Sequence, residues 1–384
     1  MLDKASTWFL VAYQEEFRQG KLVAFETLLS LSLSHLFGFY NPKEFADYLN
    51  IPHQRLYEQL KAFSLYSLQE MLLGFQVKQA VEQLRPVLEK SEATKSRASI
   101  TLSVDNSVID RVGRMLRCTY SWYSGRWKKV VRGQDLLGIV LTINGVAIPL
   151  YLRYCAKQGR ANTDKPSLLI AMLERLKDAF KQEGIDLTDI PITLDSWYVS
   201  QPLRKKLRRL GFGKIILAGK GNYSFTIDKK KQAASAWKKA LGLIDQQWGI
   251  DVPALRVKAQ SPTFGKIVLF FFQKTTTRAY YLMDFCAPHL RGVEIWHIWK
   301  QHHLVECFWK VLKSLFKIKA MQLSGDGVYT ALLTKVLAYF LAIRIKAQRA
   351  FSKLSIVQLM RKIRREYDLK TLLTEHFHLP FLGT

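Results

Sequence analysis

The pattern of hydrophobic and polar positions divides the chain into a helical N-terminal part and a strand-rich part that follows it. Residues 1 to about 92 carry apolar residues at helical spacing. Residues 88–98 are polar and charged, which predicts a linker. From Ile100 onward the pattern changes to short apolar runs, which predict strands.

The strand-rich part begins with three apolar runs, 100–104, 136–143 and 146–154, that predict antiparallel strands. Asn144-Gly145 joins the last two runs and is typical of a two-residue hairpin. The elements predicted next are a helix over 165–183, a strand over 191–194, a basic helix over 202–210 and a strand over 214–218. This order predicts an α/β fold with a mixed sheet flanked by helices, and it is the order of the RNase H-like fold.

Residues 220–288 interrupt this order with further β-like segments at 254–258, 266–273 and 278–285, and a long helix is expected over 293–316. The rest is mostly helical to about residue 367. We therefore expect four units: an all-helical N-terminal domain (1–92), the first part of the α/β core (99–219), a β-rich insertion (220–288), and the second part of the core with C-terminal helices (289–367).

The helical domain contains a pattern similar to a helix-turn-helix. Residues 42–63 predict a short helix, a break at 50–52 and a second amphipathic helix. In this interpretation the second helix enters a DNA major groove with His53, Gln54, Arg55 and Tyr57 exposed. An ordinary pair of packed helices gives the same pattern.

The charge of the chain points to a polyanionic partner. It has 384 residues, with 58 Lys and Arg against 31 Asp and Glu, a formal net charge of +27 and a pI near 9.9. Nucleic acid is the commonest partner of so basic a protein, although RNA-binding and membrane-surface proteins share this charge. A hydrophobic content of 48% excludes a disordered chain.

The cysteines and the apolar segments bear on location. Cys118, Cys155, Cys286 and Cys307 form no CxxC pair, which predicts free thiols and neither a zinc site nor a disulfide framework. The N-terminus lacks a signal-peptide pattern. The longest apolar run, 331–343, is shorter than a membrane span and contains Lys335. We therefore expect a cytoplasmic protein.

Two aspartates follow predicted strands directly: Asp105 ends TLSVD and Asp195 ends PITLD. Ligand clefts form where the strands of α/β sheets end, so carboxylates on neighbouring strands would converge there. An aspartate at such a position is also a common turn or helix N-cap residue.

A third acid lies in the predicted helix over 293–316. Trp299, His302, Glu306 and Lys313 project within a sector of roughly 60° on one side of this helix, beside an apolar face formed by Val305, Phe308, Leu312 and Leu315. A solvated face with a Glu–Lys pair is the alternative interpretation. If the helix crosses the sheet edge, Glu306 joins the two aspartates. Three such carboxylates suit Mg²⁺ or Mn²⁺, and two ions can drive in-line displacement at phosphorus.

In this constellation the chain resembles the RNase H-fold DDE transposases of bacterial insertion sequences, of the cut-and-paste type marked by Y-x2-R-x3-E-x6-K. Asp105-Asn106-Ser107 is similar to the first-acid motif and LDSWY at 194–198 to the second. Trp299, His302, Glu306 and Lys313 have the spacing of the third motif, with Trp in place of Tyr and His in place of Arg. The resemblance covers about residues 100–345.

The resemblance implies that Asp105, Asp195 and Glu306 bind two Mg²⁺ ions and that Lys313 holds a DNA phosphate. It places His302 and Trp299 where the family contacts transposon-end phosphates, although His lacks the bidentate fork of Arg. It also implies that the insertion helps to form a DNA hairpin in which an aromatic side chain stacks on a flipped base. Trp237 and Trp248 are the candidates for this role, and core positions are the alternative.

Two basic stretches are expected to bind the DNA backbone. Residues 203–239 contain twelve Lys or Arg and one acid, Asp228, and the candidates in its first helix are Arg204, Lys205 and Arg208. Residues 122–132, with Arg126 and Lys128, are expected to form an exposed loop close to Asp105.

The sequence thus predicts a bacterial, nucleoid-associated DNA transposase that cleaves terminal inverted repeats and joins them to target DNA as a homodimer on paired ends. A metal-dependent nuclease of the same fold is one alternative. A domesticated DNA-binding protein without catalysis is the other.

Overall fold

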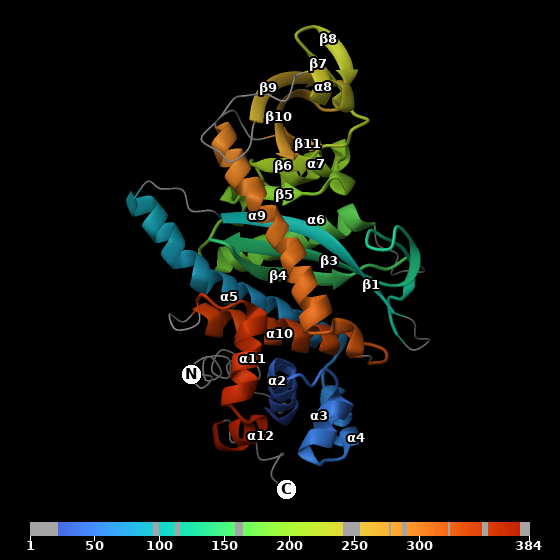
Figure 1. Cartoon of the computed structure of the whole chain (residues 1–384), viewed down its shortest axis with the longest axis vertical. Coiled ribbons are helices and arrows are strands. Elements are labelled where there is room, and N and C mark those ends of the chain that lie inside the picture. The colour runs from blue at the N-terminus through green and yellow to red at the C-terminus, as the bar shows by residue number, and fades with distance from the viewer. Residues whose placement is uncertain are drawn as a thin grey trace.

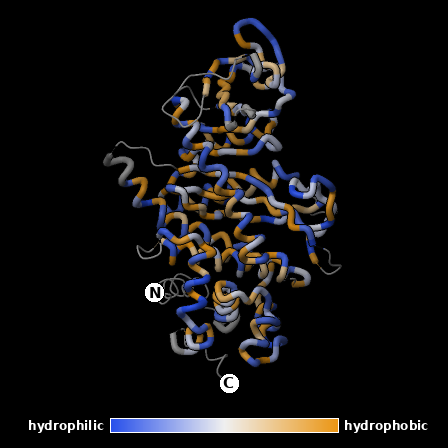
Figure 2. The backbone as a smooth tube through the Cα atoms, viewed as in Figure 1, coloured by the Kyte–Doolittle hydropathy of each residue, from blue (hydrophilic) through white to orange (hydrophobic). Residues whose placement is uncertain are grey.

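One large mixed sheet runs through the molecule, with helices packed on it and a helical group at one end (Figure 1). The computed structural model describes residues 22–94, 100–111, 116–157, 164–240, 254–275, 278–285, 290–321, 323–347 and 352–376. Hydrophobic and hydrophilic positions alternate along the sheet and the helices, and the turn at the tip between β7 and β8 is hydrophilic (Figure 2). The predicted α/β class is confirmed at this level.

The first half of the sheet has the neighbour order β4-β3-β1-β5-β6. β1 pairs antiparallel with β3, which pairs antiparallel with β4, whereas β1, β5 and β6 are parallel to one another. The bounds are β1 Ile100–Asp110, β3 Lys129–Ile143, β4 Val146–Tyr154, β5 Ile192–Leu194 and β6 Ile215–Ala218. The predicted hairpin turn is present: Asn144 and Gly145 both have positive φ, 48° and 83°, as the two-residue turn requires.

Two predicted features of this region are corrected. β1 continues five residues beyond Asp105 because β3 runs beside it to Gly133, so Asp105 lies inside a strand. Residues 122–132 form a hairpin rather than a loop: β2 Tyr120–Ser124 pairs with residues 129–133 of β3 around a turn at 125–128. We call residues 120–133 the hairpin arm.

The predicted insertion extends the same sheet. β11 pairs antiparallel with β6, and the order continues β11-β10-β9-β7-β8. The predicted β-like segments are therefore strands. The bounds are β7 Ser224–Ile227, β8 Lys230–Ala233, α8 Ala234–Ala240, β9 Ala254–Ser261, β10 Gly265–Thr275 and β11 Arg278–Asp284.

The core helices are α6 Lys165–Gln182, α7 Gln201–Arg209 and α9 Gly292–Lys310, with short turns at η2 Leu187–Asp189, η3 Ser196–Tyr198, η4 Val311–Leu315 and η5 Ile318–Ala320. α9 crosses the sheet over β1 and β5 (Figure 1). Of the predicted apolar face, Val305 and Phe308 on α9 and Leu312 on η4 are buried, and Leu315 is partly buried. Gly138 of β3 allows the close approach, since a Cβ there would lie 2.7 Å from the Trp309 ring.

Helices from the two ends of the chain pack together at one end of the molecule (Figure 1). α2 packs on α10, which is buried on nearly every side. α5 extends through the first residues of the predicted linker, as far as Thr94. The bounds are α2 Leu22–Phe37, α3 Pro42–Leu49, α4 His53–Leu60, α5 Leu65–Thr94, α10 Gly327–Ala347, α11 Ile356–Glu366, α12 Leu369–Thr371 and η6 Leu372–His376.

α10 is long and apolar enough to cross a membrane by composition, but 94% of its most apolar 18-residue window is buried within the protein. Packing inside the fold accounts for its composition. Lys335 is buried with it, and its Nζ donates to the Tyr40 carbonyl oxygen at 2.7 Å. Burial lowers the pKa of Lys335 well below its ordinary value.

The helix pair predicted over 42–63 is present as α3 and α4. Asn50 ends α3 in the left-handed conformation (φ 57°), and Leu49, Leu56 and Leu60 are buried between the helices. Arg55 is partly exposed, and Tyr57 packs partly against the core. The DNA-binding role of this pair stays a prediction.

Candidate active site

Asp105 and Asp195 occupy equivalent positions on neighbouring parallel strands. The β1–β5 register pairs Ser103 with Thr193 and Val104 with Leu194. The residue that follows this last pair is an aspartate on both sides, Asp105 within β1 and Asp195 directly after β5, so both carboxylates leave the sheet at the same level. Although Asp105 is not at a strand end, it lies where the pairing with β5 ends. The parallel register thus brings the two predicted acids together.

Asp195 also serves as a cap. It is the N-cap of η3, and its Oδ1 accepts a hydrogen bond from the Ser196 backbone N–H at 2.5 Å. The alternative interpretation of Asp195 as an N-cap residue is therefore confirmed. The side chain is nevertheless exposed, so capping does not remove it from solvent or from a ligand.

Glu306 and Lys313 face the same site from α9 and η4. Burial, together with the negative charges of Asp195 and Glu306, raises the pKa of Asp105 to about 7, although the Asn106 backbone N–H and Lys313 act in the opposite direction. Lys313 is partly buried, and burial lowers its pKa against the pull of Asp105 and other acids. We call Asp105, Asp195 and Glu306 the carboxylate site.

The donor set of the carboxylate site fits a hard divalent cation. It supplies oxygen ligands whose mutual repulsion a cation would relieve, and Asp195 and Glu306 are exposed enough to leave room for water. Within the described part of the chain, however, no three His, Cys, Asp or Glu side chains already stand close enough together to hold a metal ion.

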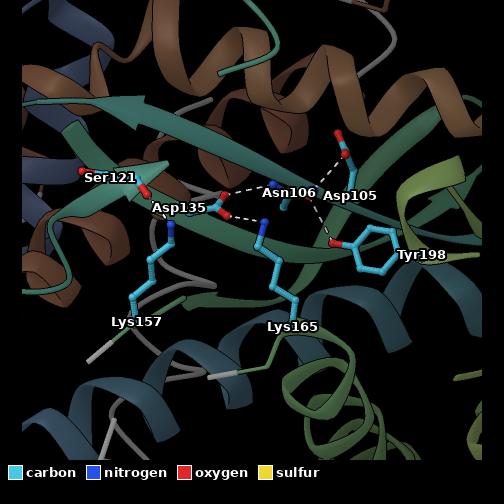
Figure 3. Close-up of polar contacts among 7 residues, drawn as sticks. All are labelled: Asp105, Asn106, Ser121, Asp135, Lys157, Lys165 and Tyr198. Atoms are coloured by element: carbon cyan, nitrogen blue, oxygen red, sulfur yellow. Dashed lines mark hydrogen bonds and ion pairs between the residues drawn. The ribbon is translucent and has the colours of Figure 1, made fainter. Parts of the chain in front are cut away.

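A buried polar network supports Asp105 from behind (Figure 3). Asn106 Nδ2 donates to Asp135 Oδ1 at 3.0 Å, and Tyr198 donates to Asn106 Oδ1 at 3.3 Å. The Lys165 ammonium lies 2.6 Å from Asp135 Oδ2. The network joins β1, β3, η3 and the start of α6. It therefore fixes the strand that carries Asp105 relative to the turn that follows Asp195.

Sequence reasoning missed this network. Its one visible signal is Asp135, a charged residue next to the apolar run of β3 that becomes fully buried. Lys165 also contacts two indoles, with its Nζ 4.7 Å from the Trp197 ring centre and 5.3 Å from that of Trp122. Trp197, two residues after Asp195, is 51% exposed.

His302 and Trp299 pack against the sheet and each other, and their predicted role as phosphate ligands stays a prediction. His302 is 7% exposed, and its Nδ1 lies 2.9 Å from Thr193 Oγ1 on β5. Trp299 stacks on its ring at 4.6 Å. Burial lowers the pKa of His302 to about 4. His302 is therefore neutral at pH 7 and packs α9 onto the sheet.

This burial predicts a pH-dependent loss of stability. The folded pKa of His302 is below its unfolded value of about 6.5, so its contribution is complete above pH 6.5 and is lost as the pH falls toward 4. We expect wild type to lose about 2 kcal/mol more than His302→Phe between pH 7.5 and pH 5 in urea unfolding. His303→Gln, exposed next to it, should behave as wild type. Equal losses of stability in wild type and His302→Phe would contradict the prediction.

The candidates on α7 have mixed exposure. Arg204 donates to the Phe264 carbonyl oxygen at 3.0 Å and lies over the Phe285 ring, and Arg208 donates to the Phe285 carbonyl oxygen. These two arginines tie α7 to the insertion. Lys205 is exposed on the same helix. Of the three, Lys205 is the one whose charge is free of such contacts.

The candidates on the hairpin arm are at its turn. Arg126 and Lys128 are exposed, and the Arg126 guanidinium lies 4.8 Å from the Trp127 ring centre. By contrast, Trp237 is a core residue: it is 6% exposed, and its Nε1 donates to the Phe225 carbonyl oxygen at 2.9 Å. Trp248 lies outside the described residues. Cys118, Cys155 and Cys307 are free thiols, and Cys286 lies outside the described residues.

Comparisons with known proteins show the fold alone. No protein-family model matches the chain, and no curated protein matches it in sequence. Among solved structures, the chain is similar to the piggyBac transposase in its synaptic complex with hairpin DNA, with a TM-score of 0.50 and 12% sequence identity. The likeness covers 95% of this chain and 73% of that one. The chain therefore has a transposase-like fold.

Proposed function

We propose that this protein is a DDE-type DNA transposase that cleaves transposon ends and transfers the freed strands into target DNA. The observation that carries this proposal is the in-register position of Asp105 and Asp195 on adjacent parallel strands, with Glu306 and Lys313 acting electrostatically on the same carboxylate. The formal charge of +27 supports a DNA substrate.

The topology supports an RNase H-like core. Its strands have the order β4-β3-β1-β5-β6, with β1 in the middle and the first three antiparallel. The β-rich insertion lies between β6 and α9, and α9 brings Glu306 back to β1. We assign 99–219 and 289–367 to the catalytic core, 220–288 to the insertion, and 1–92 to a DNA-binding domain. The similarity to a solved transposase structure is consistent with this assignment.

Asp105, Asp195 and Glu306 would hold two Mg²⁺ ions, or Mn²⁺ in their place. Bound there, the ions would activate the attacking oxygen and stabilise the leaving oxygen. Because no ready metal cage is present among the described residues, the exposed side chains of Asp195 and Glu306 must turn toward Asp105. Asp105, with its pKa near 7, would give up its remaining proton on binding a metal ion.

The chain's own residues then orient the DNA. Lys313, beside Asp105, would pair with the scissile phosphate. In cleavage, a water oxygen bonds to phosphorus as the P–O3′ bond breaks, leaving a 3′-hydroxyl and a 5′-phosphate. In transfer, that hydroxyl attacks a target phosphorus and displaces a target 3′-oxygen. We further propose terminal inverted repeats as the substrate, a homodimer on paired ends, and a bacterial cytoplasmic location.

The test is cleavage of a duplex that carries the inverted repeats flanking the gene, in Mg²⁺. We expect Asp195→Asn and Glu306→Gln to reduce nicking by at least about a thousandfold, as loss of a metal-held transition state implies. Asp178→Asn and Glu174→Gln, exposed acids on α6, are matched controls and should nick as wild type does. Unchanged nicking by Asp195→Asn would refute the site.

The products also separate this function from its alternatives. Transfer of the labelled 3′ end into an unlabelled plasmid is expected of a transposase. Nicking without transfer would indicate a nuclease of the same fold. Tight DNA binding with no cleavage in Mg²⁺ or Mn²⁺ would indicate a DNA-binding protein without catalysis.

A further inference from the structure

A cationic pocket lies at the far end of β1 from the carboxylate site. A pocket of about 480 Å³ opens between the hairpin arm and η5. The residues that line it include Asp110, Arg111, Trp127, Lys129, Arg132 and Lys319. We call it the arm pocket. It takes no part in the chemistry proposed above.

The arm pocket is strongly positive. Four cationic side chains line it against one carboxylate, and Lys319 already pairs with that carboxylate, its Nζ 3.2 Å from Asp110 Oδ2. In the part of the chain that the structure describes, neither Lys129 nor Arg132 has an ion-pair partner, and both are exposed. The positive charges of Lys129 and Arg132 are therefore available to bind an anion.

Arg111 lines the arm pocket and is 2% exposed. Its Nη2 and Nη1 donate to the carbonyl oxygens of Ile318 and Met321 at 2.6 and 3.3 Å. Its Nε has no hydrogen-bond partner among the described residues. A buried guanidinium beside an open pocket, with no carboxylate partner of its own, favours an anionic ligand there.

One wall of the pocket carries the indole of Trp127 beside Val130. Trp127 is 48% exposed and Val130 is 63% exposed. An exposed indole beside unpaired cations is the chemistry that binds a nucleotide, since the ring packs on the base or sugar while the cations hold the phosphates. An ordinary basic surface has no need of an exposed indole, so Trp127 favours a nucleotide over a simple anion.

The position of the pocket relative to Asp105 gives it a place on the DNA. Asp110 lies five residues beyond Asp105 on the same strand, which corresponds to about 16 Å at roughly 3.3 Å per residue. At about 3.4 Å per nucleotide along one DNA strand, this is about five nucleotides.

We propose that the arm pocket holds the sugar-phosphate backbone of the bound DNA about five nucleotides from the phosphate at the carboxylate site. This inference rests on the proposed function, because the DNA register is counted from the scissile phosphate. Lys129 and Arg132 bind the phosphates, and Trp127 packs against the nucleotide between them. The hairpin arm thereby sets the path of the strand as it leaves the site.

The test measures DNA binding by the full-length protein in EDTA, so that it does not depend on cleavage. The double variant Lys129→Gln/Arg132→Gln is compared with wild type on a 40-base-pair duplex bearing the terminal repeat, and Lys181→Gln/Arg361→Gln, exposed cations elsewhere, is the matched control. We expect an approximately tenfold weaker Kd at 0.1 M salt and a slope of log K against log salt reduced by about 2. The control variant should keep the wild-type Kd and the wild-type salt slope.

Ethylation interference gives the position. In wild type, modification of phosphates about five nucleotides from the cleaved bond should block binding. In the double variant this block should disappear, whereas Trp127→Leu, which keeps both cations, should retain it. An unchanged Kd and salt slope would overturn the proposal. The proposal would also be overturned if the arm pocket bound deoxyadenosine monophosphate while the double variant kept full affinity for DNA, because the pocket would then bind free nucleotides and not the DNA backbone. If Asp195→Asn leaves nicking unchanged but the double variant weakens binding, the carboxylate site fails and the arm pocket still stands as a DNA-binding site.

Discussion

Replacing Asp105 with asparagine should make the metal-free protein more stable and abolish DNA cleavage. Burial and the charges of Asp195 and Glu306 raise the pKa of Asp105 to about 7, so holding it ionised at pH 8 disfavours the folded state. We expect a gain of about 2–4 kcal/mol at pH 8. Asparagine keeps the carbonyl oxygen that accepts the Asn106 backbone N–H at 2.8 Å.

The sign of the pH dependence makes this prediction specific. Because the folded pKa lies above the unfolded value, the penalty is absent at low pH and grows as the pH rises toward 7. The advantage of Asp105→Asn should therefore shrink to about 1 kcal/mol at pH 4.5. Urea unfolding in EDTA at both pH values measures it, with Asp178→Asn as the control. A variant less stable than wild type at pH 8 would show that Asp105 is not held under electrostatic strain.

Magnesium should reverse the order of stability. Binding at the carboxylate site stabilises the folded state by mass action, so Mg²⁺ should raise the Tm of wild type but not that of Asp105→Asn. Near pH 7, binding should also release protons from wild type alone, because about half of Asp105 is still protonated there. Calorimetry in two buffers of different ionisation enthalpy detects this release.

The sequence predicts the parts of the fold that depend on local pattern. Continuous apolar runs identify β3, β4 and β6. Asn144-Gly145 identifies the hairpin between β3 and β4, because a turn with two positive φ angles accepts few other residues. Asp105 and Asp195, ninety positions apart, lie side by side because the parallel pairing of β1 and β5 ends directly before both of them. That meeting follows from the order of elements.

The sequence does not predict features that depend on partners remote in the chain. β1 continues past Asp105 through polar Asn106 and Ser107 because β3 supplies hydrogen bonds beyond the end of β5. The hairpin arm looks like a loop because Gly125 and its polar neighbours dominate the pattern. Helical spacing puts His302 beside Glu306, but the two lie on opposite sides of the boundary between buried and exposed. A rotation of about 40° at the margin of a packed helix decides which one is buried.

Removing the Asp135 carboxylate should strongly destabilise the folded protein. Asp135 is fully buried, and its partner Lys165 has a side chain only 14% exposed, so Asp135→Ala leaves an ammonium with little solvent and no carboxylate. We expect a loss of about 3–5 kcal/mol in urea unfolding at pH 7.5. Glu366→Gln, which breaks the exposed Lys362–Glu366 pair, is the control and should change little.

The double variant Asp135→Leu/Lys165→Met distinguishes an unpaired charge from lost packing. With both charges replaced by apolar groups of similar volume, most of the stability should return, since the desolvation penalty disappears together with the attraction. Asn106 then loses its acceptor at Asp135 but keeps the Tyr198 hydroxyl as a donor. If the double variant is as unstable as Asp135→Ala, the network acts through shape and not through charge, and Asp105 would owe its position to the strand pairing of β1 alone.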